Sequence, residues 1–366
     1  MSTAVLSEDT VATHVEAAYP AFTATGSPAR MTGGNLNKVW RVPGRPASVI
    51  AKYAPPHIAS APDVPLDPER LHVAARCLQL FASGEPLSDL ATPACRPPKR
   101  LGWDPEAPLL IMEDLGDLSD LGTWLHGAPP NSKAANAGSR LGTFIGHLHA
   151  RTYDAAAIAE QVANPAMQAT RHAVQYRQVQ AFLEAADIAD AEALGQRATA
   201  LGERFQQPGC CMIMGDLWPR SLLLVDHAVD TARFRIIDWE LAHYGHPAQD
   251  IGHLAAHCWM LAHRASTPDA AQAVHEWYRA FLTGYHGTVQ AKHTGSAGAF
   301  WGPEGRRMAA LHMGCEILAR TTGAFQDGYL YDGLVVNHPA MQAAVDHAAH
   351  CLRAPADTVL FESLVS

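Results

Sequence analysis

Charged residues are scarce in this chain of 366 residues. Only 17% of the residues are Asp, Glu, Lys or Arg, whereas 48% are hydrophobic, and the formal net charge is −9 with histidine neutral. Nucleic acids and anionic membrane surfaces are bound through basic patches, so the composition argues against both as partners. The apolar content is sufficient for a sizeable core and argues against wholesale disorder.

Signals for disulfides, zinc and membrane insertion are also missing. The seven cysteines are an odd number, and no two of them form a C-x-x-C pair, so we expect buried free thiols. No run of about 18 apolar residues is present, and the N-terminal segment lacks a basic stretch followed by an apolar one. The sequence therefore predicts a soluble, cytoplasmic protein with no membrane partner.

The 20 histidines raise the question of a metal site. His253 and His257 are four residues apart and would share one helix face. No H-E-x-x-H motif accompanies them. Structural histidines are therefore the favoured interpretation, with a metal site as the alternative.

The first third of the chain predicts a small antiparallel sheet with one helix. Residues 31–53 contain two short strand patterns joined by a Pro/Gly turn. Asp67 is a candidate N-cap, and Pro68 suits the first position of a helix that runs to Phe81. Residues 108–115 predict another strand. This strand–strand–helix–strand order is typical of a small β-rich lobe.

The remainder has mainly helical periodicity. Two short apolar runs interrupt it, at residues 210–214 and 234–238, and each ends in an acidic motif. No low-complexity linker separates the β-rich first third from the helical remainder. We therefore predict an α+β fold with two lobes, a small β-rich N-lobe of residues 1–115 and a larger helical C-lobe of residues 116–366.

The two acidic motifs are candidates for phosphoryl transfer. Asp216 follows the first apolar run, and Ser221 lies five residues further on, which is the kinase spacing D-x-x-x-x-N with Ser in place of Asn. Asp238 and Glu240 end the second run, where side chains two apart point to the same face. Either aspartate alone is equally consistent with a turn or an N-cap. Together they predict carboxylates for Mg²⁺ and for the acceptor hydroxyl.

A lysine and a glycine-rich turn complete this set. Lys52 lies in a β-branched strand where a kinase carries its phosphate-binding lysine, although a lone strand lysine is more often an edge-strand solubiliser. Gly33, Gly34 and Asn35 precede it by one hairpin, a layout that is weaker than G-x-G-x-x-G. Asp250 has two interpretations, a helix cap or a carboxylate that braces the catalytic loop.

These motifs together resemble 5-methylthioribose kinase and its relatives in the aminoglycoside phosphotransferase/choline kinase clan. The resemblance extends in unbroken order from about residue 31 to residue 325. The D-x-E motif in place of D-F-G favours the methylthioribose kinase branch, to which the similar fungal hydroxytryptamine kinases also belong. The segments that carry the resemblance are MTGGNLNKVWRV, SVIAKYAPPHI, DPERLHVAARCL, LLIMEDL, LGTFIGHLHAR, GDLWPRSLLL and IDWELAHYGHPAQDIGHL.

The resemblance implies a bilobal protein-kinase-like fold with ATP in the cleft and assigns roles to residues. Asp216 would orient and deprotonate the acceptor hydroxyl, with Ser221 beside it in the catalytic loop. Asp238 and Glu240 would hold Mg²⁺, and Lys52 would bind the α- and β-phosphates. Further implied contacts are Gly33, Gly34, Asn35 and Asn37 in the loop over the phosphates, Met112, Glu113 and Leu115 in the adenine-binding hinge, and Trp218 and Arg320 on the substrate side.

Several positions depart from the family pattern. Met214 stands where relatives often have His, and Pro219 and Arg220 replace small residues in the catalytic loop. Ala74 stands where relatives often carry the helix acid that pairs with the lysine. Glu69, at the start of the same helix, is therefore the remaining candidate for that pair.

The sharpest departure concerns the substrate. Methylthioribose kinases carry adjacent arginines near the C-terminal end, where this chain has Ala319 and Arg320. Loss of a guanidinium from a bidentate site is not a neutral change. Arg320 itself either lines the acceptor side of the cleft or forms a structural ion pair.

Three functions remain open from the sequence. The leading one is an ATP- and Mg²⁺-dependent kinase for a hydroxyl group of a soluble metabolite or drug-like alcohol or amine. The second is methylthioribose kinase proper, and the third is a nucleotide-binding pseudokinase with a regulatory role. The sequence identifies neither the acceptor nor the oligomeric state.

Overall fold

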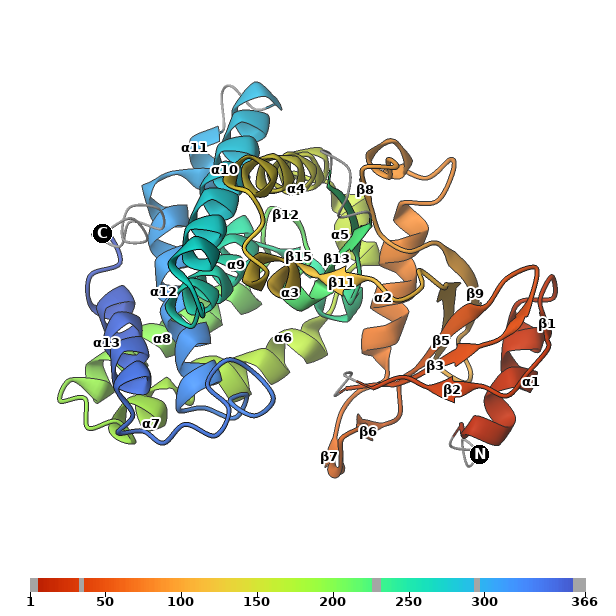
Figure 1. The fold of residues 1–366 in the computed structure, drawn as a ribbon, viewed down its shortest axis with the longest axis horizontal. Coiled ribbons are helices and arrows are strands. Elements are labelled where there is room, and N and C mark those ends of the chain that lie inside the picture. Colours follow the sequence, from red (N-terminus) through yellow and green to blue (C-terminus); the bar gives the residue numbers. More distant parts are fainter. Residues whose placement is uncertain (1–5, 33–35, 226–231, 293–296, 358–366) are drawn as a thin grey trace.

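The computed structural model describes residues 6–32, 36–225, 232–292 and 297–357. The first third of the chain forms a β-sheet, and the rest is mostly helical, as Figure 1 shows. Helix α2 (Glu69–Leu80) stands between these two parts. This arrangement confirms the predicted α+β class with a small β-rich part and a larger helical part.

The main sheet is antiparallel and places Lys52 in its centre. Lys52 lies in β5, between β3 and β10, opposite Val39 and Leu110. A lysine in a central strand is not at a sheet edge, so the interpretation of Lys52 as an edge-strand solubiliser is wrong. The strand order is β2 (Ala29–Arg30), β3 (Lys38–Val42), β5 (Val49–Tyr53), β10 (Leu109–Glu113) and β9 (Arg100–Asp104). Two short ribbons precede α2, β1 (Thr23–Ala24) with β4 (Gly44–Arg45) and β6 (His57–Ile58) with β7 (Ala61–Pro65).

Two hydrophobic clusters support the fold. The smaller lies between the sheet and helix α1 (Glu8–Ala18) and includes Val11 and Trp40. The larger extends through the helical part and includes Leu71 and Leu78 of α2. Helix α2 is therefore packed into the core of the helical part, although its residues precede the expected lobe boundary. That boundary, at residue 115, stays a prediction.

Helix α2 begins one residue later than predicted. Pro68 occupies the N-cap position, and Glu69 is the first helical residue. Asp67 lies one position earlier, where its Oδ1 accepts a hydrogen bond from the Glu69 amide at 2.9 Å. Asp67 thus satisfies an amide at the helix start without being the N-cap residue.

The helical part is organised around the contact between α4 (Asn131–Arg151) and α10 (Pro268–Lys292). A Cβ atom at Gly138 or Gly142 would fall 2.0 Å or 1.9 Å from a carbonyl oxygen of α10, so glycine is required for this close approach. Among the described residues, no helix is both long and apolar enough to cross a lipid bilayer. The other helical segments are η1 (Ser88–Leu90), α3 (Leu121–His126), α5 (Ala156–Gln161), α6 (Pro165–Arg171), η2 (His172–Tyr176), α7 (Val179–Glu184), α8 (Ala191–Gln206), η3 (Pro219–Ser221), η4 (Trp239–Leu241), α9 (Pro247–His263), α11 (Ala297–Trp301), α12 (Pro303–Thr321) and α13 (Pro339–Arg353).

Two small sheets position the acidic motifs. The apolar runs at residues 210–214 and 234–238 are confirmed as strands β12 and β14, and Asp216 and Asp238 follow shortly after them. One sheet pairs β12 (Cys211–Ile213) with β15 (His243–Gly245). The other has the order β11 (Ser119–Asp120), β13 (Leu222–Val225), β14 (Arg233–Ile236) and β8 (Cys95–Arg96).

His246 caps the N-terminus of α9. Its Nδ1 accepts a hydrogen bond from the Ala248 amide at 3.1 Å, so this nitrogen must carry no proton. Burial, together with the charge of Arg204, lowers the pKa of His246 to about 4. A neutral imidazole is therefore part of the folded structure.

We expect acid to destabilise the protein in part through His246. The unfolded chain takes up this proton near pH 6.5, whereas the folded state takes it up only near pH 4. Because the unfolded state binds more protons between these values, stability falls as the pH falls. His246→Asn keeps a cap acceptor without titrating. Its Tm, measured by calorimetry, should fall by roughly 2 °C less than that of the native protein between about pH 7 and pH 4; an equal fall contradicts this assignment.

Candidate active site

A cavity of about 470 Å³ lies between the main sheet and the helical part. Its apolar lining includes Val39 and Ile50, and the predicted hinge residues Met112, Glu113 and Leu115 lie at its edge. An apolar slot with a few polar groups is typical of a ligand site. A larger cavity of about 820 Å³ runs along α4 but is lined by none of the predicted catalytic residues. The smaller cavity is therefore the candidate site.

Lys52 makes two ion pairs at this cavity. Its Nζ lies 2.8 Å from Asp238 Oδ1 and 2.9 Å from Glu240 Oε2. Burial disfavours the ammonium, but the two carboxylates outweigh that effect and raise the pKa of Lys52 above its usual value. The structure thus brings together three of the predicted residues from two distant segments.

The two acids differ in how far they face the cavity. The side chain of Asp238 is 40% exposed, whereas that of Glu240 is 8% exposed. Asp238 has a φ of 63°, in the left-handed region that non-glycine residues rarely adopt, and such strained positions often occur at functional sites. Asn37, which is also buried, donates its side-chain amide to Glu240.

Asp250 holds the loop that carries Asp216. Its Oδ2 and Oδ1 accept hydrogen bonds from the amides of Met214 and Gly215, each at 2.8 Å. The His149 Nε2 lies 3.2 Å from the same carboxylate. Asp250 is fully buried in the first turn of α9, whose N-cap is His246. Of the two interpretations of Asp250, the brace for the loop is therefore confirmed.

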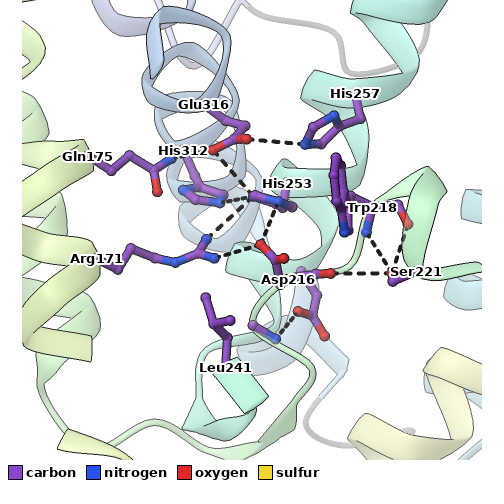
Figure 2. A network of polar contacts seen from close by, with 12 residues as sticks. Arg171, Gln175, Asp216, Trp218, Ser221, Leu241, His253, His257, His312 and Glu316 are labelled. Atoms are coloured by element: carbon purple, nitrogen blue, oxygen red, sulfur yellow. Dashed lines mark hydrogen bonds and ion pairs between the residues drawn. The ribbon is translucent and has the colours of Figure 1, made fainter. Parts of the chain in front are cut away.

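Asp216 lies in a polar network that Figure 2 shows. Its Oδ1 accepts a hydrogen bond from Arg171 Nη2 at 2.8 Å and lies 3.2 Å from His253 Nε2. Burial favours the neutral acid, but the contact with His253 and the charges of His253, Arg171 and Arg320 hold the pKa of Asp216 well below its usual range. The carboxylate is therefore ionised at neutral pH.

Glu316 forms the second centre of this network. It accepts hydrogen bonds from Gln175 at 2.8 Å and from Arg320 at 2.7 Å, and it lies 3.1 Å from His257 Nε2. Burial and the charges of His253 and Arg320 outweigh the contact with Glu316 and lower the pKa of His257 to about 3, so its ring is neutral. The far side of that ring contacts the Tyr329 hydroxyl at 2.8 Å.

The alternative of a histidine metal site has a partial counterpart here. Potential ligand atoms of His253, His257 and Glu316 lie within 4.8 Å of one another. Each of these side chains already contacts other polar groups, and the guanidinium groups of Arg171 and Arg320 lie against the same cluster. These two positive charges would repel a metal ion, so we interpret the cluster as a polar network.

Ser221 holds the catalytic loop together. Its side chain is fully buried, and its Oγ donates to the carbonyl of Trp218 at 2.8 Å within the turn η3. The expected place of Ser221 in the catalytic site stays a prediction.

Trp218 and Arg320 lie on the same side of the catalytic loop. The Arg320 guanidinium is 4.8 Å from the Trp218 ring and 5.5 Å from the Tyr329 ring. Trp218 also lines the cavity. Arg320 is close enough for its charge to act on Asp216, but its guanidinium is paired with Glu316. The expected contact of Trp218 and Arg320 with the substrate stays a prediction.

Glu69 does not contact the lysine. Its carboxylate lies 3.2 Å from Arg76 and 3.6 Å from His72, both on its own helix. The predicted pair between Glu69 and Lys52 is therefore wrong. Gly33, Gly34 and Asn35, which were expected to cover the phosphates, lie outside the described residues.

Three residues that contact the predicted site residues were missed from the sequence, Arg70, Arg171 and Glu316, and so was the contact of His253 with Asp216. Glu316 and Arg320 are four residues apart in α12, a spacing that signals an ion pair on a helix. His253 follows Asp250 by three residues and shares its helix face. Arg70 and Arg171 carry no comparable local signal, because their partners lie in other segments.

Each comparison with known proteins finds phosphotransferases or kinases. The family model described as the phosphotransferase enzyme family matches residues 29–293. The 4-hydroxytryptamine kinase of Psilocybe cyanescens is 27% identical over 255 residues, which is 64% of this chain and 67% of that protein. The 4-hydroxytryptamine kinase of Psilocybe cubensis is 24% identical over 248 residues, with the same coverage. The GDP complex of aminoglycoside 2'-phosphotransferase-IIIa has the same fold, with a TM-score of 0.52, 12% identity and coverage of 95% of this chain and 99% of that chain.

We expect Arg320→Met to lower stability, because it leaves the buried Glu316 carboxylate without its guanidinium. Breaking a buried pair costs about 3–5 kcal/mol, so Tm should fall by several degrees. Arg307→Met is the matched control, since Arg307 pairs with an exposed Glu304 on the same helix and surface pairs contribute about 0–1 kcal/mol. If both variants melt alike, Arg320 is not a structural ion-pair partner.

Proposed function

The chain belongs to the phosphotransferase enzyme family, and we propose that it is a kinase that transfers the γ-phosphoryl group of ATP to a hydroxyl group of a small molecule. The observation that carries the proposal is that Lys52 and Asp238 form an ion pair in the lining of the cavity, and that Asp216 lies two residues before Trp218, which lines the same cavity. Phosphoryl transfer needs a cation on the phosphates, a carboxylate for the metal and a carboxylate for the acceptor. These three residues supply one of each.

The cavity supports a nucleotide as the phosphoryl donor. Its apolar wall would contact the adenine ring, with the segment from Met112 to Leu115 along the ring edge. Lys52, buried and charged at the other end, would bind the α- and β-phosphates. The structural relative with bound GDP supports a nucleotide site in this fold.

Asp238 supports a place for Mg²⁺. Mg²⁺ prefers anionic oxygen ligands, and Asp238 presents a 40% exposed carboxylate of which Lys52 contacts Oδ1. When bound, Mg²⁺ would neutralise the charge that develops on the phosphates. Glu240 is less suited to this role, because it is buried and contacts both Lys52 and Asn37.

Asp216 would hold the acceptor. As an ionised carboxylate it accepts a hydrogen bond from the hydroxyl and directs that oxygen toward the γ-phosphorus, and it takes the proton as the bond forms. Arg171 and His253 fix its orientation through their contacts with Oδ1. The retention of Lys52, Asp216 and Asp238 speaks against a pseudokinase.

The acceptor is proposed to be an aromatic amino alcohol or phenol. Trp218 and Tyr329 present ring surface close to the catalytic loop, and the sequence relatives are named as 4-hydroxytryptamine kinases. Methylthioribose is a weaker candidate, because Arg320 is paired with Glu316 and Ala319 stands where methylthioribose kinases carry the second arginine.

Asp216→Asn should lower kcat by about 10³-fold, because the amide cannot accept the hydroxyl proton. ATP affinity should change little. ADP release is measured across a panel of hydroxyindoles, phenolic amines, amino alcohols and sugars, with Asp190→Asn as control, since Asp190 pairs with Arg353 at the surface. Turnover within tenfold of the native value removes Asp216 from the catalytic role.

Asp238→Asn should raise the Mg²⁺ concentration for half-maximal activity at least tenfold, because the variant loses an anionic oxygen ligand. Activity is titrated with Mg²⁺ at saturating ATP and acceptor. Activity should recover in part at high Mg²⁺. A titration curve that coincides with that of the native protein argues against Asp238 as a ligand.

A further inference from the structure

The partner of the phosphate-binding lysine comes from an unexpected place. Protein kinases pair this lysine with a glutamate of the neighbouring helix. Here α2 occupies the place of that helix. The α2 residues that line the cavity are Ala74 and Leu78, neither of which is an acid, and Glu69 of the same helix contacts Arg76. Among the described residues, the carboxylates paired with Lys52 are those of Asp238 and Glu240.

Glu240 has the surroundings of such a partner. Its Oε2 lies 2.9 Å from Lys52 Nζ and accepts the Asn37 amide, and its side chain is only 8% exposed. Glu240 is also not among the residues that line the cavity, whereas Asp238 is. Asp238 contacts Lys52 as well, but through Oδ1, and its side chain is 40% exposed.

Arg70 anchors this arrangement from α2. The residue is fully buried, and its Nε donates to Asn37 Oδ1 at 3.2 Å. Its Nη atoms donate to the carbonyls of Leu36 at 2.9 Å and Pro55 at 3.1 Å. They also donate to two carbonyls near the start of α2, those of Leu66 at 3.3 Å and Asp67 at 2.6 Å. The chain before β3 and the chain after β5 are thereby both fixed to the helix.

We propose that Glu240 is the positioning residue for Lys52, held in place by Asn37 and Arg70, and that of the two D-x-E acids Asp238 is the one that ligates Mg²⁺. This inference rests on the proposed function and revises the expected role of Glu240. The helix contributes a cation instead of the usual acid, and the acid comes from the turn η4 against which α2 packs. The ion pair that aligns the lysine is kept, but its acid comes from η4 and not from α2.

The first test separates a metal ligand from a lysine partner without using catalysis. Mn²⁺, which substitutes for Mg²⁺ and is paramagnetic, is titrated into the protein–ADP complex and followed by electron paramagnetic resonance. Glu240→Gln should leave the Mn²⁺ Kd within twofold, whereas Asp238→Asn should raise it at least tenfold. Glu304→Gln is the control, since Glu304 is an exposed acid in α12. A tenfold increase for Glu240→Gln overturns the proposal.

The second test separates positioning from a purely structural role. Glu240→Gln should lower kcat at least tenfold, and added Mg²⁺ should not restore it, because the lysine is misplaced and no ligand is missing. Asn37→Ala, which keeps the carboxylate but releases it, should lower kcat in the same way and serves if Glu240→Gln does not fold. A kcat within threefold of the native value in folded protein overturns the proposal. If the native protein phosphorylates no acceptor, the proposed function fails, and the Mn²⁺ titration still tests Glu240 because it needs only ADP.

Discussion

The buried ammonium of Lys52 is the constraint on which the candidate site depends. An ion almost removed from water must be matched by opposite charge at hydrogen-bonding distance. Lys52 comes from the centre of the main sheet, and both carboxylates that match it come from the segment just after β14, in the helical part. The contact thus joins two segments that are far apart in the sequence, at the place where the phosphates of a nucleotide would lie.

The second polar cluster follows the same rule. Asp216 and Glu316 are the anions, and Arg171 and Arg320 are the cations that balance them. Burial keeps the pKa of His312 well below its usual value, so this ring adds no charge. Because each carboxylate already has a guanidinium partner, the network holds the catalytic loop in place before any ligand enters. Rigid support of this kind is what a reacting carboxylate requires.

The sequence predicted those parts of the site that follow from local pattern. Strands β12 and β14 are short apolar runs that end in acids, so Asp216 and Asp238 could be located from the pattern itself. The errors concern which side chain of an element faces inward. Glu69 and Arg70 are adjacent at the start of α2, and only the orientation of the helix on η4 buries Arg70 and leaves Glu69 near the surface. Such orientation depends on tertiary packing, which one sequence does not reveal.

The pairing of strand β8 has a mechanical consequence. Cys95 and Arg96 are hydrogen-bonded in parallel to β14, at the edge of the four-stranded sheet of the helical part, and α2 is packed into the same core. The chain therefore crosses from the main sheet into the helical part after β5 and returns to it before β9. A rotation of the main sheet and α1 that opened the cavity would leave α2 and β8 with the helical part. The chain would then have to bend around these two segments, in addition to the single stretch after β10.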